Sequence, residues 1–229
     1  MNLLQAEEKR TPVLFDALPE EILQRLESQL KEFVFQKKQI IHRAGLMPTG
    51  LFIIRKGKVK IYHISDTARE VIIHIAGEGE MVGYSALMRK SEYHFWAEAI
   101  EKSEVDFLPQ KYFYDFIENQ PLFSVRLMQE FARQFDTVMD KMVDMLSDHV
   151  RKRTAKTLIW LMQTYGLEED EKTIKILLSR QDLAHLVATN TETLVRTLTE
   201  FRKEKVIELN RKKIVVSDLE KLNRIARMS

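Results

Sequence analysis

"SRQDLAHLVATNTETLVRTLTEF", residues 179–201, has the pattern of two short helices joined by a tight turn. Ser179 and Asp182 match the S-x-x-D signal that caps the start of a helix. The apolar face of this first helix comes from Leu183, Leu186 and Val187. Ala184 is small, as is required where two helices cross closely, and a turn of three or four residues follows. The stretch therefore predicts a helix-turn-helix.

The second helix has two candidate starting residues. Thr189 and Glu192 match a T-x-x-E capping box, while Asn190 is an equally good N-cap. Its inward face should carry the apolar residues at i, i+4 and i+7, which are Leu194, Leu198 and Phe201. The polar head then faces outward at the N-terminal end, which is the end of a recognition helix that enters the DNA major groove.

Four outward residues of this head are candidates for base contacts: Thr191, Glu192, Val195 and Arg196. Arginine can donate a bidentate pair to guanine, and glutamate can accept from cytosine N4. Threonine can bind phosphate or touch a thymine methyl, so Thr193 is a candidate phosphate contact. The alternative is that Glu192 and Arg196 only form an exposed i,i+4 salt bridge.

A basic hairpin follows at "VIELNRKKIVV", residues 206–216, with Asn210 and Arg211 near its tip. It resembles the wing of a winged helix. Three cations of this hairpin are candidate phosphate contacts, namely Arg211, Lys212 and Lys213. The alternative is a solvated loop. "IKILL", residues 174–178, is expected to be a strand.

Composition narrows the class of protein. Residues 151–229 hold 17 Lys and Arg against 11 Asp and Glu, a net charge of +6, and the remainder has a net charge of −4. A basic C-terminal part suits nucleic acid, with chance variation as the alternative. Because the chain has no cysteine, it cannot form disulfides or cysteine-ligated metal sites. It has no apolar run of about 18 residues and no secretory signal, so we expect a cytoplasmic protein without a membrane partner.

The N-terminal half reads differently. Residues 16–31 have helical spacing, and residues 33–108 form short alternating runs separated by glycines. Such runs predict an antiparallel barrel or sandwich. The chain shows no phosphate-cradling glycine loop, no H-E-x-x-H and no convincing nucleophile–base pair, so we expect neither an enzyme nor a metal site.

A long helix is expected at residues 119–150. Its apolar residues recur at intervals of three and four, which is typical of a coiled-coil seam. The predicted seam consists of Met128, Phe131, Phe135, Val138, Met142 and Met145, and His149 ends it. Polar residues cover the rest of the helix, so pairing of two chains into a homodimer is favoured over a long helix packed on its own domain.

The whole order resembles the catabolite activator/FNR (Crp/Fnr) family of bacterial transcription regulators. The most specific stretches are "SRQDLA", "TETLVR" and "IVV", supported by "GLFIIRKGKVKIY" and "GEGEMVGYSAL". The resemblance implies an α+β chain with three parts. These are a cyclic-nucleotide-binding-like β-roll (a double-stranded β-helix) over 1–118, a dimerisation helix over 119–150 and a winged helix-turn-helix over 151–229.

For DNA, the resemblance implies base-edge contacts from Thr191, Glu192 and Arg196, and phosphate contacts from Arg180 and Gln181. It implies a palindromic site whose half-sites contain a TGA-type core, and RNA polymerase as a protein partner. Three residues depart from the family pattern. Thr191 stands where one branch has arginine, Val195 where a small residue or serine is common, and Ala188 where the turn usually has glycine.

The sensory part departs further. Tyr84 stands in the position of the glutamate that binds ribose, Tyr93 and His94 stand in the Arg-Ser positions, and Val138 and Met139 replace the polar pair that reaches adenine. Without a cation, a buried cyclic phosphate would be unpaired and costly, so we do not expect cyclic AMP to bind in the family's manner.

What occupies the sensory part instead is left open. The expected pocket comprises Gly83, Tyr84, Ser85, Tyr93, His94, Val138 and Met139. These residues suit either a small apolar effector or a filled core that needs no effector. Some relatives hold haem through a histidine, for which His63, His74 and His94 are available, although a histidine on a strand is more often structural.

The leading expectation is a homodimeric, sequence-specific DNA-binding transcription regulator without a cofactor. A first alternative is a regulator of the same family that senses haem or another ligand. A second is a ligand-gated protein-interaction module that does not read DNA. The steep salt dependence of DNA binding would separate this last reading from the others.

Overall fold

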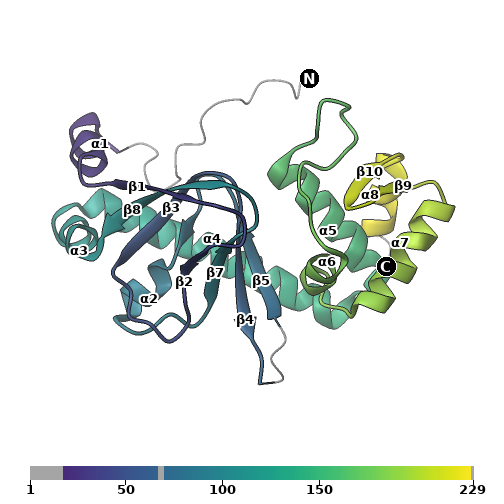
Figure 1. The fold of residues 1–229 in the computed structure, drawn as a ribbon, viewed down its shortest axis with the longest axis horizontal. Coiled ribbons are helices and arrows are strands. Elements are labelled where there is room, and N and C mark those ends of the chain that lie inside the picture. The colour runs from purple at the N-terminus through teal and green to yellow at the C-terminus, as the bar shows by residue number, and fades with distance from the viewer. Residues whose placement is uncertain (1–17, 67–69, 228–229) are drawn as a thin grey trace. The chain divides into compact units, whose positions relative to one another are not determined.

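The computed structural model describes residues 18–66 and 70–227 (Figure 1). The expectation that residues 1–15 carry no secretory signal lies outside the described residues. The chain divides into two compact units. The first runs to Asp136 without Val71–Ile73, and the second comprises Val71–Ile73 and the residues from Thr137 onward. Each unit is described by itself.

The first unit is built from two antiparallel four-stranded sheets with helices beside them. Its strands are β1 (Lys31–Phe35), β2 (Ile40–His42), β3 (Gly50–Lys56), β4 (Val59–Ile64), β5 (Glu70–Ala76, apart from Val71–Ile73), β6 (Met81–Val82), β7 (Trp96–Ala99) and β8 (Ser103–Pro109). The sheet orders are β1-β8-β3-β6 and β2-β7-β4-β5. Its helices are α1 (Glu20–Glu27), α2 (Tyr84–Arg89), α3 (Gln110–Asn119) and the first part of α4 (Pro121–Ser147). The predicted α+β class and antiparallel β-rich domain are confirmed.

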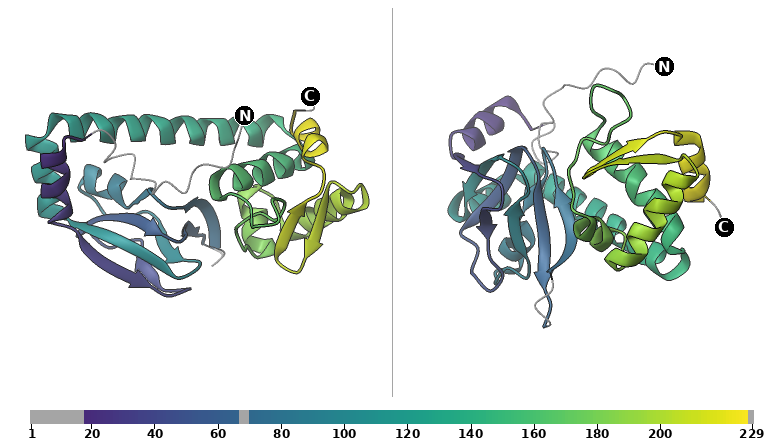
Figure 2. Two further views of the ribbon diagram at one scale, coloured as in Figure 1. Left: turned by 90° about the horizontal axis from the view of Figure 1, so that it is seen from above. Right: turned by 45° about the vertical axis from the view of Figure 1, so that its right-hand side comes forward.

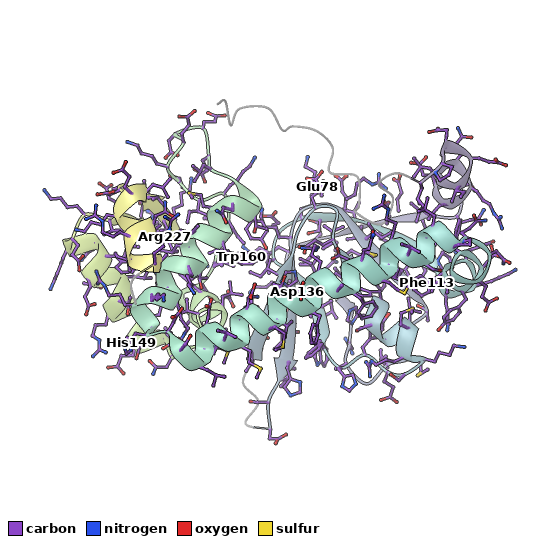
Figure 3. All side chains as sticks on the ribbon, turned by 180° about the vertical axis from the view of Figure 1, so that it is seen from behind. Glu78, Phe113, Asp136, His149, Trp160 and Arg227 are labelled. Atoms are coloured by element: carbon purple, nitrogen blue, oxygen red, sulfur yellow. The ribbon has the colours of Figure 1, made fainter. Side chains whose placement is uncertain are left out.

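Two apolar clusters form the core of this unit. The inner faces of β3, β4, β6, β7 and β8 meet in one, which includes Phe52, Ile54 and Val105. In the other, α1, α3 and the start of α4 cover β3 and β8, and Phe113 is fully buried there (Figure 3). Helices α1 and α3 lie side by side (Figures 1 and 2), and Arg25 of α1 pairs with Asp115 of α3 at 2.8 Å.

Helix α4 is one unbroken helix of 27 residues (Figure 2). One side of its first half is buried at Phe123, Leu127 and Glu130. The opposite side is exposed along its length. The described part of the chain holds no helix that is both long and apolar enough to cross a membrane.

The second unit contains α5 (Val150–Tyr165), α6 (Arg180–Leu186), α7 (Thr191–Lys203), β9 (Ile207–Asn210), β10 (Lys213–Val216) and α8 (Leu219–Arg227). The strand expected at 174–178 is wrong over most of its length. Thr173 pairs with Val215, and the Ile174 amide donates to the Ile214 carbonyl at 3.0 Å. The side chains of 174–178 do alternate between buried and exposed. An extended segment without a neighbouring strand beyond Ile174 cannot continue a sheet.

His42 of β2 lies inside the first unit, with 8% of its surface exposed, and stacks on Tyr93 at 3.9 Å between ring centroids. Burial lowers the pKa of His42 from 6.5 to about 4. The folded state therefore binds fewer protons than the unfolded state between these pH values. Its stability contribution is present above pH 6.5 and is lost as the pH falls toward 4.

We expect the unfolding free energy of the first unit to fall by about 2 kcal/mol between pH 7 and pH 5 through His42 alone. His42→Phe should remove this part of the pH dependence. In a Trp160→Phe background, Trp96 is the only tryptophan and reports on this unit during urea unfolding. His63→Gln, at an exposed position, is the control and should keep the wild-type pH dependence. An unchanged pH dependence in His42→Phe would contradict the assignment.

Candidate nucleic-acid interface

The start of α6 is fixed by the predicted capping pair. The Ser179 hydroxyl accepts from the Asp182 amide at 3.0 Å, and the Asp182 carboxylate accepts from the Ser179 amide at 3.2 Å. Two N–H groups that a helix start leaves without partners are thereby satisfied. Leu183 and Ala184 are buried beneath this turn, as their spacing predicted.

The turn after α6 is closed by two backbone bonds. The Ala188 amide donates to the His185 carbonyl at 3.0 Å, and the Thr189 amide donates to the Ala184 carbonyl at 2.9 Å. This is the Schellman arrangement, which places Ala188 in the left-handed region with a φ of 56°. Alanine there costs about 1–2 kcal/mol relative to an ordinary helical conformation.

Arg153 of α5 contacts this turn, a role that the sequence pattern did not predict. Its guanidinium donates to the carbonyls of Val187 and Ala188 at 3.0 Å each, and to the Asp148 carbonyl at 2.7 Å. Neither spacing nor composition singles Arg153 out from the other cations of "VRKR", because its partners at 187 and 188 are distant in the sequence.

Of the two residues that could start the second helix, the structure selects Asn190. The Asn190 side chain accepts from the Thr193 amide at 2.8 Å, so Asn190 is the N-cap of α7. The Thr189–Glu192 capping box is therefore not formed. The reason is that the Thr189 amide is used in closing the turn, which leaves Thr189 one residue outside the cap.

The inward face of α7 is as predicted. Leu194, Leu198 and Phe201 are fully buried, and Thr197 is buried with its hydroxyl donating to the Thr193 carbonyl at 2.9 Å. Arg151 of α5 holds the far end of the helix. Its guanidinium lies 4.9 Å from the Phe201 ring centroid.

The outward face of α7 carries the four predicted base-reading residues. Thr191, Glu192 and Arg196 are exposed, and Val195 is 44% exposed. In the part of the chain that the structure describes, neither Glu192 nor Arg196 forms an ion pair within 4.0 Å, so the alternative of a mutual salt bridge is not realised. Both charges are available to a partner.

The wing is a two-residue hairpin. Asn210 pairs with Lys213, which leaves Arg211 and Lys212 at the tip, with Arg211 at a φ of 55°. Arg211 and Lys212 are exposed. Lys213 is half-buried, and its ammonium lies 2.6 Å from the Glu168 carboxylate. Much of its charge is therefore neutralised within the protein.

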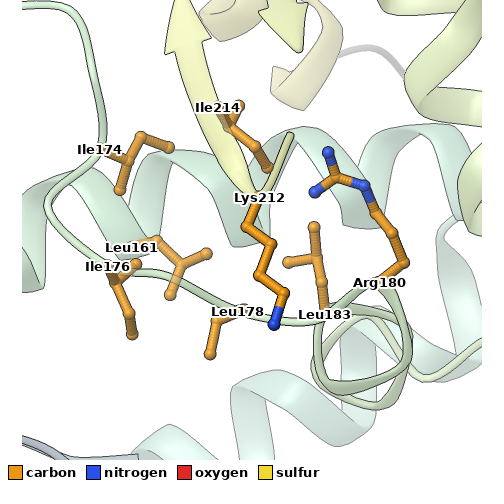
Figure 4. Close-up of a pocket in the computed structure, with 8 residues that line it drawn as sticks. All are labelled: Leu161, Ile174, Ile176, Leu178, Arg180, Leu183, Lys212 and Ile214. Atoms are coloured by element: carbon orange, nitrogen blue, oxygen red, sulfur yellow. The ribbon is translucent and has the colours of Figure 1, made fainter. Parts of the chain in front are cut away.

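Arg180 connects α6 to this wing. Its guanidinium donates to the Arg211 carbonyl at 2.8 Å, and burial lowers its pKa. Figure 4 shows Arg180 and Lys212 beside the apolar side chains of the wing and α6. The cavity between them is about 10 Å³ and can hold no more than one water.

Of the other predicted phosphate contacts, Gln181 is exposed and Thr193 is half-buried.

In the first unit, Tyr84 lies in the core and not on an open surface. It is 6% exposed, its ring packs edge-on against Phe131 at 4.8 Å, and its hydroxyl donates to the Gln134 side chain. Burial raises the pKa of Tyr84.

Gln134 belongs to a polar cluster on α4 that the sequence pattern did not predict. Its amide donates to Glu130, which is 3% exposed and accepts two further bonds from Arg133 at 2.6 and 2.8 Å. Arg133 also lies 3.9 Å from Glu80, and His74 lies 3.2 Å from the same carboxylate.

Tyr93 is the second aromatic residue of the expected pocket. It stacks on His42, is 5% exposed, and has its pKa raised by burial to about 12. Gly83 has a φ of 86°, and a Cβ there would lie 2.8 Å from the Tyr93 ring. Tyr84 and Tyr93 are thus packed side chains, which agrees with the filled-core alternative.

The remaining pocket residues are dispersed. Ser85 and His94 are exposed, and His94 Nε2 lies 2.6 Å from Arg89 Nη1 at the surface. Val138 and Met139 are 58% and 41% exposed and belong to the second compact unit. Within residues 18–66 and 70–227, no group of three or more His, Asp or Glu side chains is placed to hold a metal ion.

The exposed side of α4 carries five of the six predicted seam residues. Met128, Phe135, Val138, Met142 and Met145 are 51–65% exposed. Phe131 is the exception, because it packs on the core of its own unit. The apolar residues that continue the exposed stripe at intervals of three and four are Val125, Met128, Ala132, Phe135, Met139, Met142 and Leu146. We call this stripe the α4 face.

Comparison with known proteins identifies two segments. A model described as "Cyclic nucleotide-binding domain" matches residues 32–120, and one described as "Crp-like helix-turn-helix domain" matches residues 152–225. The first segment contains the two sheets, and the second contains α6, α7 and the wing.

Relatives match over nearly the whole chain. A "CRP-like cAMP-activated global transcriptional regulator" of Mycobacterium tuberculosis is 26% identical over 93% of this chain and 96% of its own length. An "Anaerobic regulatory protein" of Aggregatibacter actinomycetemcomitans is 26% identical over 82% of this chain and 73% of its own.

Solved structures agree in fold. FixK2 of Bradyrhizobium japonicum has a TM-score of 0.77 at 17% identity, covering 87% of this chain and 98% of its own. Thermus thermophilus catabolite activator protein has a TM-score of 0.53 at 26% identity, covering 93% and 98%.

Proposed function

Because this chain belongs to the Crp/Fnr family of DNA-binding transcription regulators, we propose that it acts as a homodimer on a palindromic DNA site. Each half-site is read by the N-terminal end of α7. This proposal rests on the exposure of the charged residues on the outward face of α7. Glu192 and Arg196 are exposed and unpaired there, while the apolar side of the same helix is fully buried.

The chemistry of this face assigns roles. Arg196 donates to a guanine, and Glu192 accepts from a cytosine amino group, which gives a half-site core of the TGA type that contains a G·C pair. Thr191 and Val195 flank this pair on the same exposed face. Val195 offers a methyl surface that suits a thymine methyl. These two residues would set the bases in which the preferred site differs from those of relatives.

The candidate phosphate contacts fall into two groups, exposed residues and cations that already bind a group within the protein. Arg211 and Lys212 at the wing tip are exposed and supply the salt-dependent part of the affinity, with Gln181 and Thr193 as neutral contacts. Arg180 and Lys213 already bind the Arg211 carbonyl and Glu168. Of the predicted phosphate contacts, Arg180 and Lys213 would contribute least to DNA affinity in this conformation of the wing.

A second copy of the chain is the partner proposed for the α4 face. Its residues recur at coiled-coil spacing and leave a 27-residue helix apolar on its solvent side. Two-fold pairing places two recognition helices in symmetric half-sites, which is why the site is a palindrome. RNA polymerase is the further protein partner that this function implies.

We assign residues 1–118 as the sensory part, 119–150 as the dimerisation helix and 151–229 as the DNA-binding domain. The sensory part lacks the residues for cyclic AMP. Tyr84 and Tyr93 fill the core where the family places a glutamate and an arginine, and Arg89 is held at the surface beside His94. We propose that this chain, unlike the cAMP-activated relative from Mycobacterium tuberculosis, does not take cyclic AMP as its signal.

For DNA reading, we expect Glu192→Ala with Arg196→Ala to abolish preference for the selected half-site. Each lost contact between a side chain and a base is worth about 1–3 kcal/mol, or roughly 5- to 150-fold in affinity. The measurement is DNA selection on purified protein, followed by anisotropy titrations at several salt concentrations. Arg202→Ala is the matched control, since it removes an exposed arginine from the C-terminal end of α7. Retention of the wild-type motif by the double variant would overturn the assignment.

Lys212→Ala gives the contrasting result in the same titrations. It should weaken binding to all sequences alike and reduce the salt slope by about 0.9 for each lost phosphate contact, or about 1.8 for the dimer.

For assembly, we expect Phe135→Glu to convert the dimer to a monomer. Phe135 is 65% exposed at the centre of the α4 face, and a carboxylate there would face its symmetry mate in a desolvated seam. Sedimentation velocity gives the mass. Gln129→Glu introduces the same charge about a third of a turn away, outside the stripe, and should leave the dimer intact. A dimeric Phe135→Glu protein would show that another surface pairs the chains.

For the signal, calorimetry with cyclic AMP should show no heat of binding up to about 1 mM ligand. The Mycobacterium tuberculosis relative, titrated under the same conditions, is the positive control. Micromolar binding by this chain would contradict the proposal.

A further inference from the structure

Arg153 makes three hydrogen bonds, all of them to backbone carbonyls. Nε donates to Val187, Nη2 donates to Ala188, and Nη1 donates to Asp148. The first two acceptors belong to the turn between α6 and α7. The third belongs to the residue that follows α4. One side chain therefore joins the end of the long helix to the turn of the helix-turn-helix.

The turn has a specific need for this donor. The Val187 and Ala188 carbonyls lie just past the C-terminal end of α6, where backbone carbonyls have no intrahelical partner and the helix dipole is negative. Ala188 adds a left-handed backbone at a residue with a Cβ, which is unfavourable without outside support. A cation that donates to both carbonyls stabilises the left-handed geometry directly.

The direction of α7 depends on this geometry. Asn190, the N-cap of α7, is two residues beyond Ala188, and the base-reading residues begin at Thr191. A backbone rotation at Ala188 would therefore move the whole reading face. Arg151, two residues before Arg153 on α5, bonds to Glu204 at 2.8 Å just past the far end of α7.

The chemistry at 153 requires arginine in particular. A guanidinium presents donors in a rigid planar fork, and here three of its nitrogens reach three different acceptors. A lysine ammonium is a single point charge and cannot span the same carbonyls. Charge alone would be supplied equally by the neighbouring Lys152. Its ammonium pairs with the Asp148 carboxylate at 2.8 Å and, among the residues that the structure describes, donates no hydrogen bond to the turn.

We propose that Arg153 is a positioning residue for the recognition helix, holding Ala188 in its left-handed conformation and thereby setting the orientation of the reading face. In its effect on DNA affinity, this inference rests on the proposed DNA-binding function. Its effect on the turn does not. Arg153 itself touches no DNA.

The first experiment measures the turn without DNA. Hydrogen exchange of the Ala188 and Thr189 amides, which close the turn, should become about tenfold faster in Arg153→Gln and in Arg153→Lys. Lys152→Gln, which removes the same charge from the adjacent residue, should leave both rates unchanged. Unchanged exchange in both Arg153 variants would overturn the proposal, whether or not the protein binds DNA. Should Arg153→Gln fail to fold, Arg153→Lys decides.

The second experiment measures DNA affinity by anisotropy on the selected site. Arg153→Gln and Arg153→Lys should each lose about tenfold in affinity with an unchanged salt slope, because no phosphate contact is removed. Lys152→Gln should stay within about twofold of wild type.

The decisive arm is Ala188→Gly. Glycine adopts the left-handed conformation freely, so it should restore most of the affinity to Arg153→Gln while changing the wild type little. A salt slope reduced by about two in the Arg153→Gln dimer, without rescue by Ala188→Gly, would instead make Arg153 a phosphate contact and overturn the proposal.

Discussion

Ala188 has a φ of 56° and lies between two helices whose adjoining ends are both fully capped. On one side, the carbonyls of Ala184 and His185 accept the Thr189 and Ala188 amides. On the other, Asn190 caps α7. These short-range bonds, together with the Arg153 guanidinium that donates to the Val187 and Ala188 carbonyls, limit the angle between α6 and α7. Burial of Leu194, Leu198 and Phe201 then fixes which side of α7 faces outward. The exposure of Glu192 and Arg196 is a consequence of these two constraints.

The basic charge of the second unit is less available than its net value suggests. Arg151, Lys152, Lys156 and Lys213 lie in ion pairs with carboxylates of the same unit. Such pairs stabilise the junctions between elements and contribute little long-range field. The proposed contacts with phosphates and bases rest on three exposed cations in the N-terminal half of α7 and at the wing tip, namely Arg196, Arg211 and Lys212. DNA affinity should depend on this small set and not on the total charge.

The first unit uses its aromatic and polar residues for internal packing. Tyr84 joins the core to α4 through Phe131 and Gln134, and Tyr93 stacks on His42. The Glu130–Arg133 pair is satisfied within this unit without a ligand. Because one side of α4 is occupied in this way, its apolar residues on the other side have no partner in the described chain. The same helix therefore contributes to a core on one side and presents an exposed apolar stripe on the other.

Local patterns in the sequence determined the parts of this protein that depend on neighbours along the chain. The Ser179–Asp182 cap, the buried spacing of α7, the hairpin of the wing and the antiparallel character of residues 33–108 all rest on bonds or periodicities within a few residues. These signals also placed the base-reading candidates on the exposed side of a helix, before any tertiary contact was known.

Only the tertiary structure decided features that depend on distant partners. Phe131 was expected in the seam, but its ring packs against Tyr84 in the core, and the neighbouring Ala132 takes its place on the exposed α4 face. The choice of Asn190 over Thr189 as the cap has a local cause that the capping motifs do not show, because the Thr189 amide donates to the nearby Ala184 carbonyl. The partners of Arg153 and Lys213 lie 34 and 45 residues away in the chain. Periodicity in the sequence indicates which residues can be buried. Which of several equally suitable residues is buried depends on the surfaces against which they pack in the folded chain.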